Sequence, residues 1–202
     1  MKKFLGLLTI GLSFTLSAQA AVINILPSSE NLYVGDELAL NVEISNLQQT
    51  NGPSLGVYDL RLNFDSDLFA IKSIQFGDSI KGNQLDLNGQ GTLQTSDSGT
   101  NSGKGWLNLF ELSFDSVEDL NNIQAGDFTL FSVIFTTLEK GTGLFSLDAN
   151  SLGDAYGNNL LIDNIQNSSV NISAVSVPEP TGLVLAGLGL LALGVRRIKP
   201  TI

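Results

Sequence analysis

The chain has 202 residues, a formal net charge of −10 at pH 7, and neither histidine nor cysteine. These absences exclude disulfide bonds, thiolate nucleophiles and cysteine-held zinc or iron–sulfur sites, and they exclude a Ser-His-Asp triad and an imidazole metal site. Carboxylate-only catalysis and a calcium site remain open. The length suits one domain of ordinary size.

The first 20 residues are organised like a secretory signal peptide. A lysine pair precedes the apolar run 4–16, and the small residues Ala18 and Ala20 follow it. A basic region, an apolar region and an A-x-A site in this order predict export and cleavage, which we expect after Ala20. The run is too short to span a membrane comfortably. The alternative interpretation is a buried N-terminal helix.

The body of the chain, residues 21–176, is strongly acidic. It carries 19 acidic and five basic residues, which gives a net charge of −14. Such a domain repels phosphate backbones, so the sequence argues against nucleic-acid binding. A solvated acidic surface explains the charge most simply.

Apolar and polar residues alternate through this body, which indicates β-strands. The segment 38–45 places four aliphatic side chains on one face, and the segment 58–64 repeats the pattern with Asp59, Arg61 and Asn63 facing water. Further strands are expected at 21–26, 69–76, 106–114, 128–137, 143–148, 159–163 and 168–175.

Two of these segments, 106–114 and 128–137, have apolar residues on both faces, which predicts central strands. Glycine-rich turns separate the segments, and Ser116 with Asp119 predicts one short helical turn. About nine strands in this length predict an all-β fold, a β-sandwich.

The segment 78–105 is rich in Gly, Asn, Ser, Asp and Thr and has few apolar residues. Loops this long are usually mobile or functional. We expect a flexible connector, with a binding lid as the alternative and a short edge strand near 92–95.

Candidate ligand contacts are few. Sugar recognition rests on exposed aromatic rings, and Trp106 and Tyr156 are the candidates we select. Trp106 begins a predicted central strand, and we expect it to cap the core, with a place on the rim of the sandwich as the alternative interpretation.

Acidic clusters suggest calcium, which binds hard oxygen ligands. The candidate ligands are Asp148, Asn150 and Asp154, although they lack a complete calcium-binding loop. Asx-turns account for the same residues without a metal. No other cofactor is predicted.

Paired carboxylates could in principle hydrolyse glycosides. The pairs are Asp65 with Asp67 and Glu118 with Asp119. Because Asp65 follows a strand, capping of backbone amides accounts for it, and we predict that the chain is not an enzyme.

The C-terminus combines a Pro-Glu-Pro motif, a short apolar run and a basic tail. A helix of the run would be roughly 21 Å long, short of the roughly 30 Å hydrocarbon core. Cations after the run predict a cytoplasmic C-terminus, an external body and a transient membrane anchor. The motif comprises Pro178, Glu179 and Pro180, the run spans 182–195, and the tail contains Arg196, Arg197 and Lys199.

These features, in this order over Val177–Ile202, resemble the PEP-CTERM sorting signal of Gram-negative bacteria. The resemblance implies recognition and processing by an exosortase, a membrane transpeptidase-like enzyme, after export by the secretion machinery. Thr181 departs from the Ser usual at its position. The alternative is a plain C-terminal membrane anchor.

The body resembles a cohesin module in several segments: 34–42, 56–77 with its aromatic-Asp-x-x-Leu turn, 126–135 and 154–172. Asp67 departs from this pattern, where Pro is common. The resemblance implies a nine-stranded jelly-roll sandwich related to carbohydrate-binding modules. It also implies binding of dockerin modules or polysaccharide without catalysis.

Together these features divide the chain into a signal peptide (1–20), a cohesin-like β-sandwich (21–176) and a sorting signal (177–202). The predicted function is that of an exported, non-catalytic surface or extracellular-matrix protein that binds polysaccharide or a dockerin-like protein. The alternatives are a structural matrix component that self-associates through unpaired sheet edges, and a glycan-active enzyme.

Overall fold

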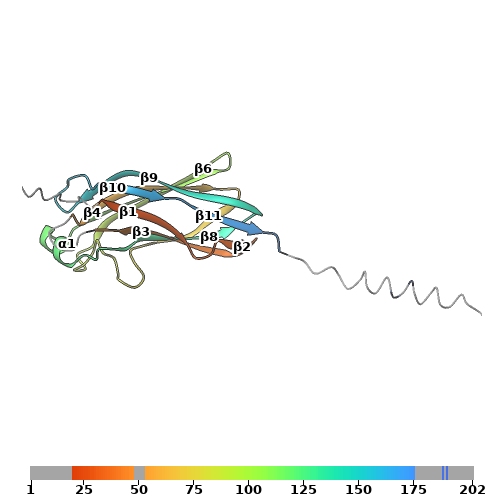
Figure 1. The fold of residues 1–202 in the computed structure, drawn as a ribbon, viewed down its shortest axis with the longest axis horizontal. Helices are drawn as coiled ribbons and strands as arrows, with labels where there is room; N and C mark the ends of the chain where they lie inside the picture. The colour runs from red at the N-terminus through yellow and green to blue at the C-terminus, as the bar shows by residue number, and fades with distance from the viewer. Residues whose placement is uncertain (1–19, 48–52, 176–187, 189, 191–202) are drawn as a thin grey trace, which may run out of the picture.

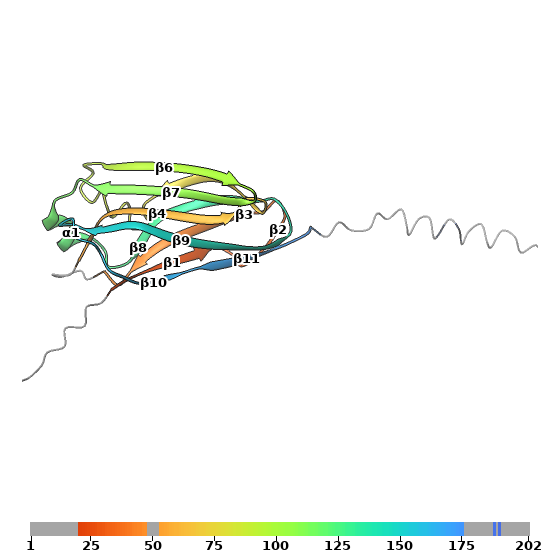
Figure 2. The ribbon, with the colours of Figure 1, turned by 90° about the horizontal axis from the view of Figure 1, so that it is seen from above.

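The computed structural model describes residues 20–47 and 53–175, together with residues 188 and 190. They form a sandwich of two β-sheets with one short helix at its end (Figures 1 and 2). The five-stranded sheet has the order β10-β1-β3-β8-β5, and the six-stranded sheet has the order β2-β11-β9-β4-β7-β6. The elements are β1 (Ala21–Pro27), β2 (Asn31–Tyr33), β3 (Glu37–Ser45), β4 (Leu55–Asp65), β5 (Phe69–Phe76), β6 (Thr92–Asn101), β7 (Lys104–Ser113), α1 (Val117–Ile123), β8 (Phe128–Thr137), β9 (Gly141–Asp154), β10 (Ile162–Gln166) and β11 (Ser168–Ser173).

The all-β sandwich predicted from the sequence is confirmed. The alternating segments form β3 and β4, in which burial also alternates residue by residue. The predicted helical turn is α1, and the hydroxyl of Ser116 caps it by accepting a hydrogen bond from the N–H of Asp119 at 3.1 Å.

Two strands depart from the apolar pattern. β2 has three residues, and β6 has ten, whereas the sequence suggested only a short strand near 92–95. β6 lies at the edge of its sheet and most of its residues are exposed, so no alternation marks it in the sequence. The strand expected at 159–163 begins instead at Ile162, after a turn.

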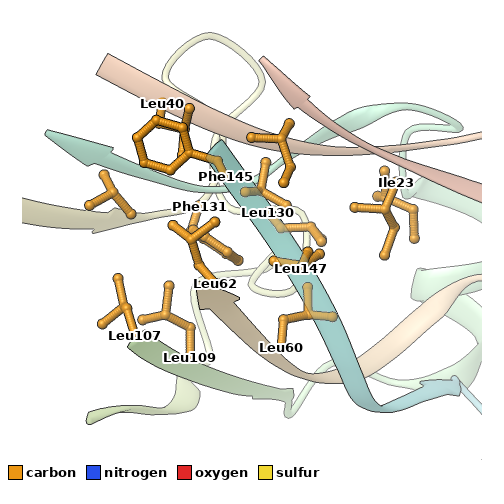
Figure 3. Packing of buried hydrophobic residues seen from close by; sticks show 14 of the residues in the cluster. Ile23, Leu40, Leu60, Leu62, Leu107, Leu109, Leu130, Phe131, Phe145 and Leu147 are labelled. Carbon is orange, nitrogen blue, oxygen red and sulfur yellow. The ribbon is translucent and has the colours of Figure 1, made fainter. Parts of the chain in front are cut away.

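The core lies between the two sheets and is apolar (Figure 3). Four phenylalanines, Phe64, Phe69, Phe135 and Phe145, form its aromatic centre. The centroids of neighbouring rings in this group are 4.7–5.9 Å apart. Since the rings come from strands of both sheets, their packing joins the layers and fixes how they align.

The segment between β5 and β6 is anchored, which corrects the flexible connector expected from its composition. Leu85 is 1% exposed. The side-chain oxygen of Gln84 accepts a hydrogen bond from the N–H of Ala125 at 2.8 Å, and its carbonyl accepts one from Gln124 Nε2 at 2.9 Å. Composition did not reveal this because, apart from Leu85, the anchoring contacts are made by polar residues.

The predictions for the two chain ends fall largely on residues that the structure does not describe. The predicted signal peptide lies outside the described residues except for Ala20, and the sorting segment lies outside them except for residues 188 and 190. Among the described residues, no helix has the length and apolar character needed to cross a membrane. The chain leaves β11 at the end of the sandwich opposite α1 (Figure 2).

Candidate functional site

The outer face of the six-stranded sheet gathers polar and aromatic side chains. On β4, Asp59, Arg61 and Asn63 alternate with buried residues, so they point away from the core as predicted. The strand register places Asn63 opposite Trp106 of β7 and Arg61 opposite Asp148 of β9. Directly opposed residues of antiparallel strands share a face, so these side chains form one surface.

Hydrogen bonds between side chains organise this outer face. Asn63 Nδ2 donates to Asp148 Oδ2 at 2.8 Å, and Asn108 Nδ2 donates to Asp59 Oδ1 at 2.8 Å. Asn150 Nδ2 donates to Asp59 Oδ1 at 3.1 Å and to Asn108 Oδ1 at 3.0 Å. Such bonds hold the side chains in defined rotamers before a ligand arrives.

Arg61 and Trp106 form a stacked pair on this face. The Arg61 Cζ atom lies 4.4 Å from the centroid of the Trp106 ring, within the range of a cation–π interaction. Arg61 joins neither of the two salt bridges within the described residues, and its Nε is buried without a hydrogen-bond partner. Because Gly105 and Leu107 are the inward-facing neighbours, Trp106 does not cap the core.

A cavity of about 320 Å³ adjoins Trp106. Phe64 and Phe69, beside the turn between β4 and β5, contribute apolar walls, and Ser98 and Thr100 of β6 contribute hydroxyl groups. The volume is at the lower end of the range of small-ligand pockets, roughly 300–1,000 Å³. The aromatic walls of Phe64 and Phe69 and the side chains of Ser98 and Thr100 lie on the inner side of the sheet, because Ser98 and Thr100 pair with the inward-facing Leu107 and Gly105.

The outer face of the five-stranded sheet differs from that of the six-stranded sheet because it presents no aromatic side chain from β5 or β8 among the described residues. Its aromatic residues occupy inward-facing positions of β5 and β8. Side chains on its outer face include Ala39, Asn41, Ser132 and Ile134, and Ser132 Oγ donates to Asn41 Oδ1 at 2.8 Å. Among the described residues, only the six-stranded sheet thus pairs a tryptophan with an arginine on its outer face.

The second predicted ligand contact, Tyr156, does not join Trp106. β4 pairs with β7 at Asn63, opposite Trp106, and with β9 at Leu55, opposite Asp154. Tyr156 follows Asp154 in a turn and is 70% exposed. The two aromatic side chains therefore lie toward opposite ends of β4 and cannot hold one small ligand together.

The three predicted calcium ligands do not converge either. Asp148 and Asn150 lie on the outer face, whereas Asp154 is six residues beyond Asp148, roughly 20 Å along an extended strand. Asp154 Oδ1 accepts from the N–H groups of Tyr156 at 2.9 Å and Asn158 at 2.8 Å, which is an Asx-turn. No group of three or more Asp, Glu, His or Cys side chains suited to a metal occurs in the described part of the chain.

One carboxylate of each predicted pair serves local structure. Asp65 Oδ1 accepts a hydrogen bond from the N–H of Asp67 at 2.9 Å, the capping role expected for it. Asp119 Oδ2 accepts one from the hydroxyl of Ser116 at 2.7 Å, at the start of α1. Both contacts stabilise turns at the ends of elements.

One buried charged residue, Glu111 of β7, was missed in the sequence. Its carboxylate accepts hydrogen bonds from Tyr58 Oη at 2.9 Å, Thr92 Oγ1 at 2.9 Å, Gln94 Nε2 at 2.7 Å and Asn83 Nδ2 at 2.5 Å. Burial and then the adjacent carboxylate raise the pKa of Tyr58 well above its ordinary value. The only sequence signal was an acidic residue at an inward position of an alternating strand.

Comparison with known proteins identifies the body of the chain. The cohesin domain family matches residues 24–172. The chain belongs to the cohesin family. A PEP-CTERM protein-sorting motif matches residues 176–198, directly after this cohesin domain. No curated protein sequence matches the chain significantly.

Solved cohesins share the fold at low sequence identity. The second type II cohesin module of the ScaA scaffoldin of Acetivibrio cellulolyticus has a TM-score of 0.61 and 16% identity, with 81% of this chain and 96% of that chain covered. A type II cohesin from the cellulosome of the same organism has a TM-score of 0.58 and 19% identity, with coverages of 75% and 95%. A type I cohesin–dockerin complex from Clostridium thermocellum gives a TM-score of 0.57 and 11% identity, with coverages of 78% and 96%.

These matches confirm the two family resemblances found in the sequence. Cohesin domains are non-catalytic docking modules that bind dockerins, and PEP-CTERM signals are recognised by exosortases. The chain therefore combines a docking module with the sorting signal of an exported surface protein.

Proposed function

We propose that this exported protein docks a dockerin-bearing partner through the outer face of its six-stranded sheet. Membership in the cohesin family supports a docking role. Within this chain, the stacked Arg61–Trp106 pair is the observation that favours this face. Tryptophan and arginine are among the residues on which the energy of protein interfaces most often concentrates.

The surroundings of the pair suit it to this role. The hydrogen bonds of Asn63 and Asp148 lie beside it and limit the side-chain entropy lost on binding. Stacking on Trp106 orients the Arg61 guanidinium, which has no salt bridge within the described residues. The guanidinium is thus free to donate to carboxylate or carbonyl oxygens of a partner.

Binding measurements on the full chain in mild detergent test this proposal, with a panel of purified dockerin modules as the probe. We expect Arg61→Ala and Trp106→Ala each to weaken binding by about tenfold or more. The matched control is Asn41→Ala, on the outer face of the other sheet, which should leave the dissociation constant unchanged. Equal effects of all three substitutions, or no binding to any dockerin, would contradict the proposal.

Polysaccharide binding is the second candidate, and the cavity beside Trp106 favours it. Aromatic walls from Phe64 and Phe69 beside Ser98 and Thr100, whose side chains lie on the inner side of β6, are suited to a sugar ring. A glycan array with the full chain tests this function. Thr100→Trp should fill the cavity and abolish glycan binding while dockerin binding persists, whereas glycan binding that survives this change would exclude the cavity.

We further propose that the chain matures by removal of both ends. The signal peptide 1–20 would be cleaved after Ala20, and exosortase would process the segment 177–202 at the membrane, releasing the body 21–176 to the surface or matrix. The order of the Pro-Glu-Pro motif, apolar run and basic tail supports the second step, as does the family match to residues 176–198.

The intact mass of the protein recovered from the surface of producing cells tests this maturation. We expect a mass that lacks both ends, and Glu179→Ala should leave the chain in the membrane. A surface protein that retains Arg196 and Arg197 would contradict processing and indicate a plain anchor.

A further inference from the structure

The sandwich has four sheet edges, and three are protected against pairing with another chain. β2 has three residues and β10 has five, so both offer little backbone. β5 carries a register shift between Ile71 and Ser73, and the intervening residue is Lys72. Bulges, lysines and short strands are devices by which edges avoid association.

The fourth edge, β6, lacks all of these devices. It has ten residues without proline or lysine, and its pairing with β7 is continuous and free of register shifts. β6 ends the strand order of its sheet and lies at the outer margin of the sandwich (Figure 2). Such an edge is a template for β-strand addition.

The hairpin between β6 and β7 determines which backbone groups are free. Its two loop residues, Ser102 and Gly103, have φ angles of 51° and 78°, the conformation of a type I′ turn. In this turn the C=O of Asn101 accepts from the N–H of Lys104, so Asn101 and every second residue before it point their backbone groups at β7. The even-numbered residues of β6 therefore present their N–H and C=O groups to solvent.

We propose that two copies of this chain pair antiparallel through β6 with Ser96 at the two-fold axis. In this register Ser96 lies opposite its own copy, Gln94 opposite Ser98, and Thr92 opposite Thr100. These five residues are symmetric about Ser96, so each free N–H meets a free C=O of the other copy. The two six-stranded sheets then form one continuous sheet, and the outer faces of both copies lie on the same side of it.

The side chains on the outer face fit the same register. Asp97 lies opposite Thr95 rather than opposite its own copy, so no two carboxylates face each other. Leu93, which is 48% exposed, lies opposite Gly99 of the other copy. Gly99 has no side chain, and the Trp106 ring lies directly over it, since a Cβ there would be 2.8 Å from Trp106 Cζ2. Leu93 of one copy thus reaches Trp106 of the other.

Analytical ultracentrifugation of the full chain in mild detergent tests the dimer. Ser96→Pro removes an N–H that faces solvent, so it spares the pairing with β7 while blocking the edge. We expect it to raise the dimer dissociation constant by about tenfold or more, whereas Ser96→Ala, the matched control, leaves it unchanged. The hydrophobic C-terminus is the same in every variant, so any association through it cancels in the comparison. A dissociation constant that Ser96→Pro leaves unchanged would overturn the proposal, as would a wild-type protein that stays monomeric.

Cysteine cross-linking tests the register without relying on proline. The chain has no cysteine of its own. Thr95→Cys and Asp97→Cys, mixed and mildly oxidised, place two thiols on opposed residues about 4.5 Å apart at Cα and should form a disulfide-linked dimer. Either variant alone holds its thiols beyond the roughly 7 Å Cα limit and should cross-link poorly. Equal cross-linking in all three samples, or none in the mixture, would contradict this register.

Discussion

Glu111 is an acidic residue buried inside the sandwich, where its carboxylate is surrounded by hydrogen-bond donors. It is fully buried, and its carboxylate accepts hydrogen bonds from Tyr58, Asn83, Thr92 and Gln94. A buried charge is tolerated only when such donors replace water. Because the donors come from β4, β6 and the segment before β6, this one residue joins three parts of the chain.

Removal of the carboxylate should therefore be costly. We expect Glu111→Ala to lower the free energy of unfolding by about 3 kcal/mol, since several buried donors lose their acceptor. Urea denaturation measures this loss. Glu139→Ala, at an exposed position, is the matched control and should stay within about 0.5 kcal/mol of wild type. A similar loss in both variants would refute the role of Glu111.

Tyr58 should make the stability depend on alkaline pH. Burial and then Glu111 raise the pKa of Tyr58 in the folded protein above its ordinary value of 10.0. Above about pH 10 the unfolded chain gains by ionising this phenol while the folded chain does not, so the stability is full below that pH and is lost as pH rises. We expect the free energy of unfolding to fall less steeply above pH 10 in Tyr58→Phe than in wild type. Identical slopes would show that Tyr58 is not responsible.

At the scale of elements, the segment between β5 and β6 behaves as part of the fold. Its composition predicted a flexible connector, yet Leu85 is buried and Gln84 bonds to the chain after α1. β6 shows the complementary case, in which a polar sequence forms a long regular strand at an edge. In both elements the decisive contacts come from residues distant in sequence.

Two substitutions test whether the segment between β5 and β6 is packed against the core, one at a buried apolar residue and one at an exposed apolar residue. Leu85→Ala should lower the free energy of unfolding by about 2–3 kcal/mol, because it leaves a cavity under the segment. Ile80→Ala removes an apolar side chain that is 92% exposed and should change it by less than about 0.5 kcal/mol. Both values follow from urea denaturation. Equal, small effects would mean that the segment is not packed against the core.

At the scale of the whole molecule, the acidic balance of residues 21–176 is a source of self-repulsion. The net charge of this body is −14, and its described residues form two salt bridges, both exposed. Surface ion pairs contribute little, so they offset little of the repulsion.

Salt should therefore stabilise the protein. We expect the thermal unfolding midpoint to rise between about 0.01 M and 0.5 M NaCl as the Debye length shortens. A falling midpoint would contradict net repulsion. We also expect equal midpoints in calcium chloride and magnesium chloride at equal ionic strength, because Asp148 and Asp154 do not converge on one site. A higher midpoint with calcium would contradict this expectation.

The sequence by itself determined the strands that bury one face, because a buried face imposes a period of two on the apolar residues. It also carried both family resemblances, since the cohesin strand pattern and the Pro-Glu-Pro motif are local in sequence. Arg61 and Asn63 could be placed on an outer face for the same reason.

Only the tertiary structure decided which residues meet. It stacked Arg61 on Trp106, separated Trp106 from Tyr156 and Asp148 from Asp154, gathered donors around Glu111, and left β6 as an open edge. The physical reason is that these relations depend on strand order and register, which long-range pairing fixes and local periodicity does not record. The acidic, histidine-free and cysteine-free composition excluded whole classes of chemistry, and the fold then showed where the remaining polar and aromatic residues act together.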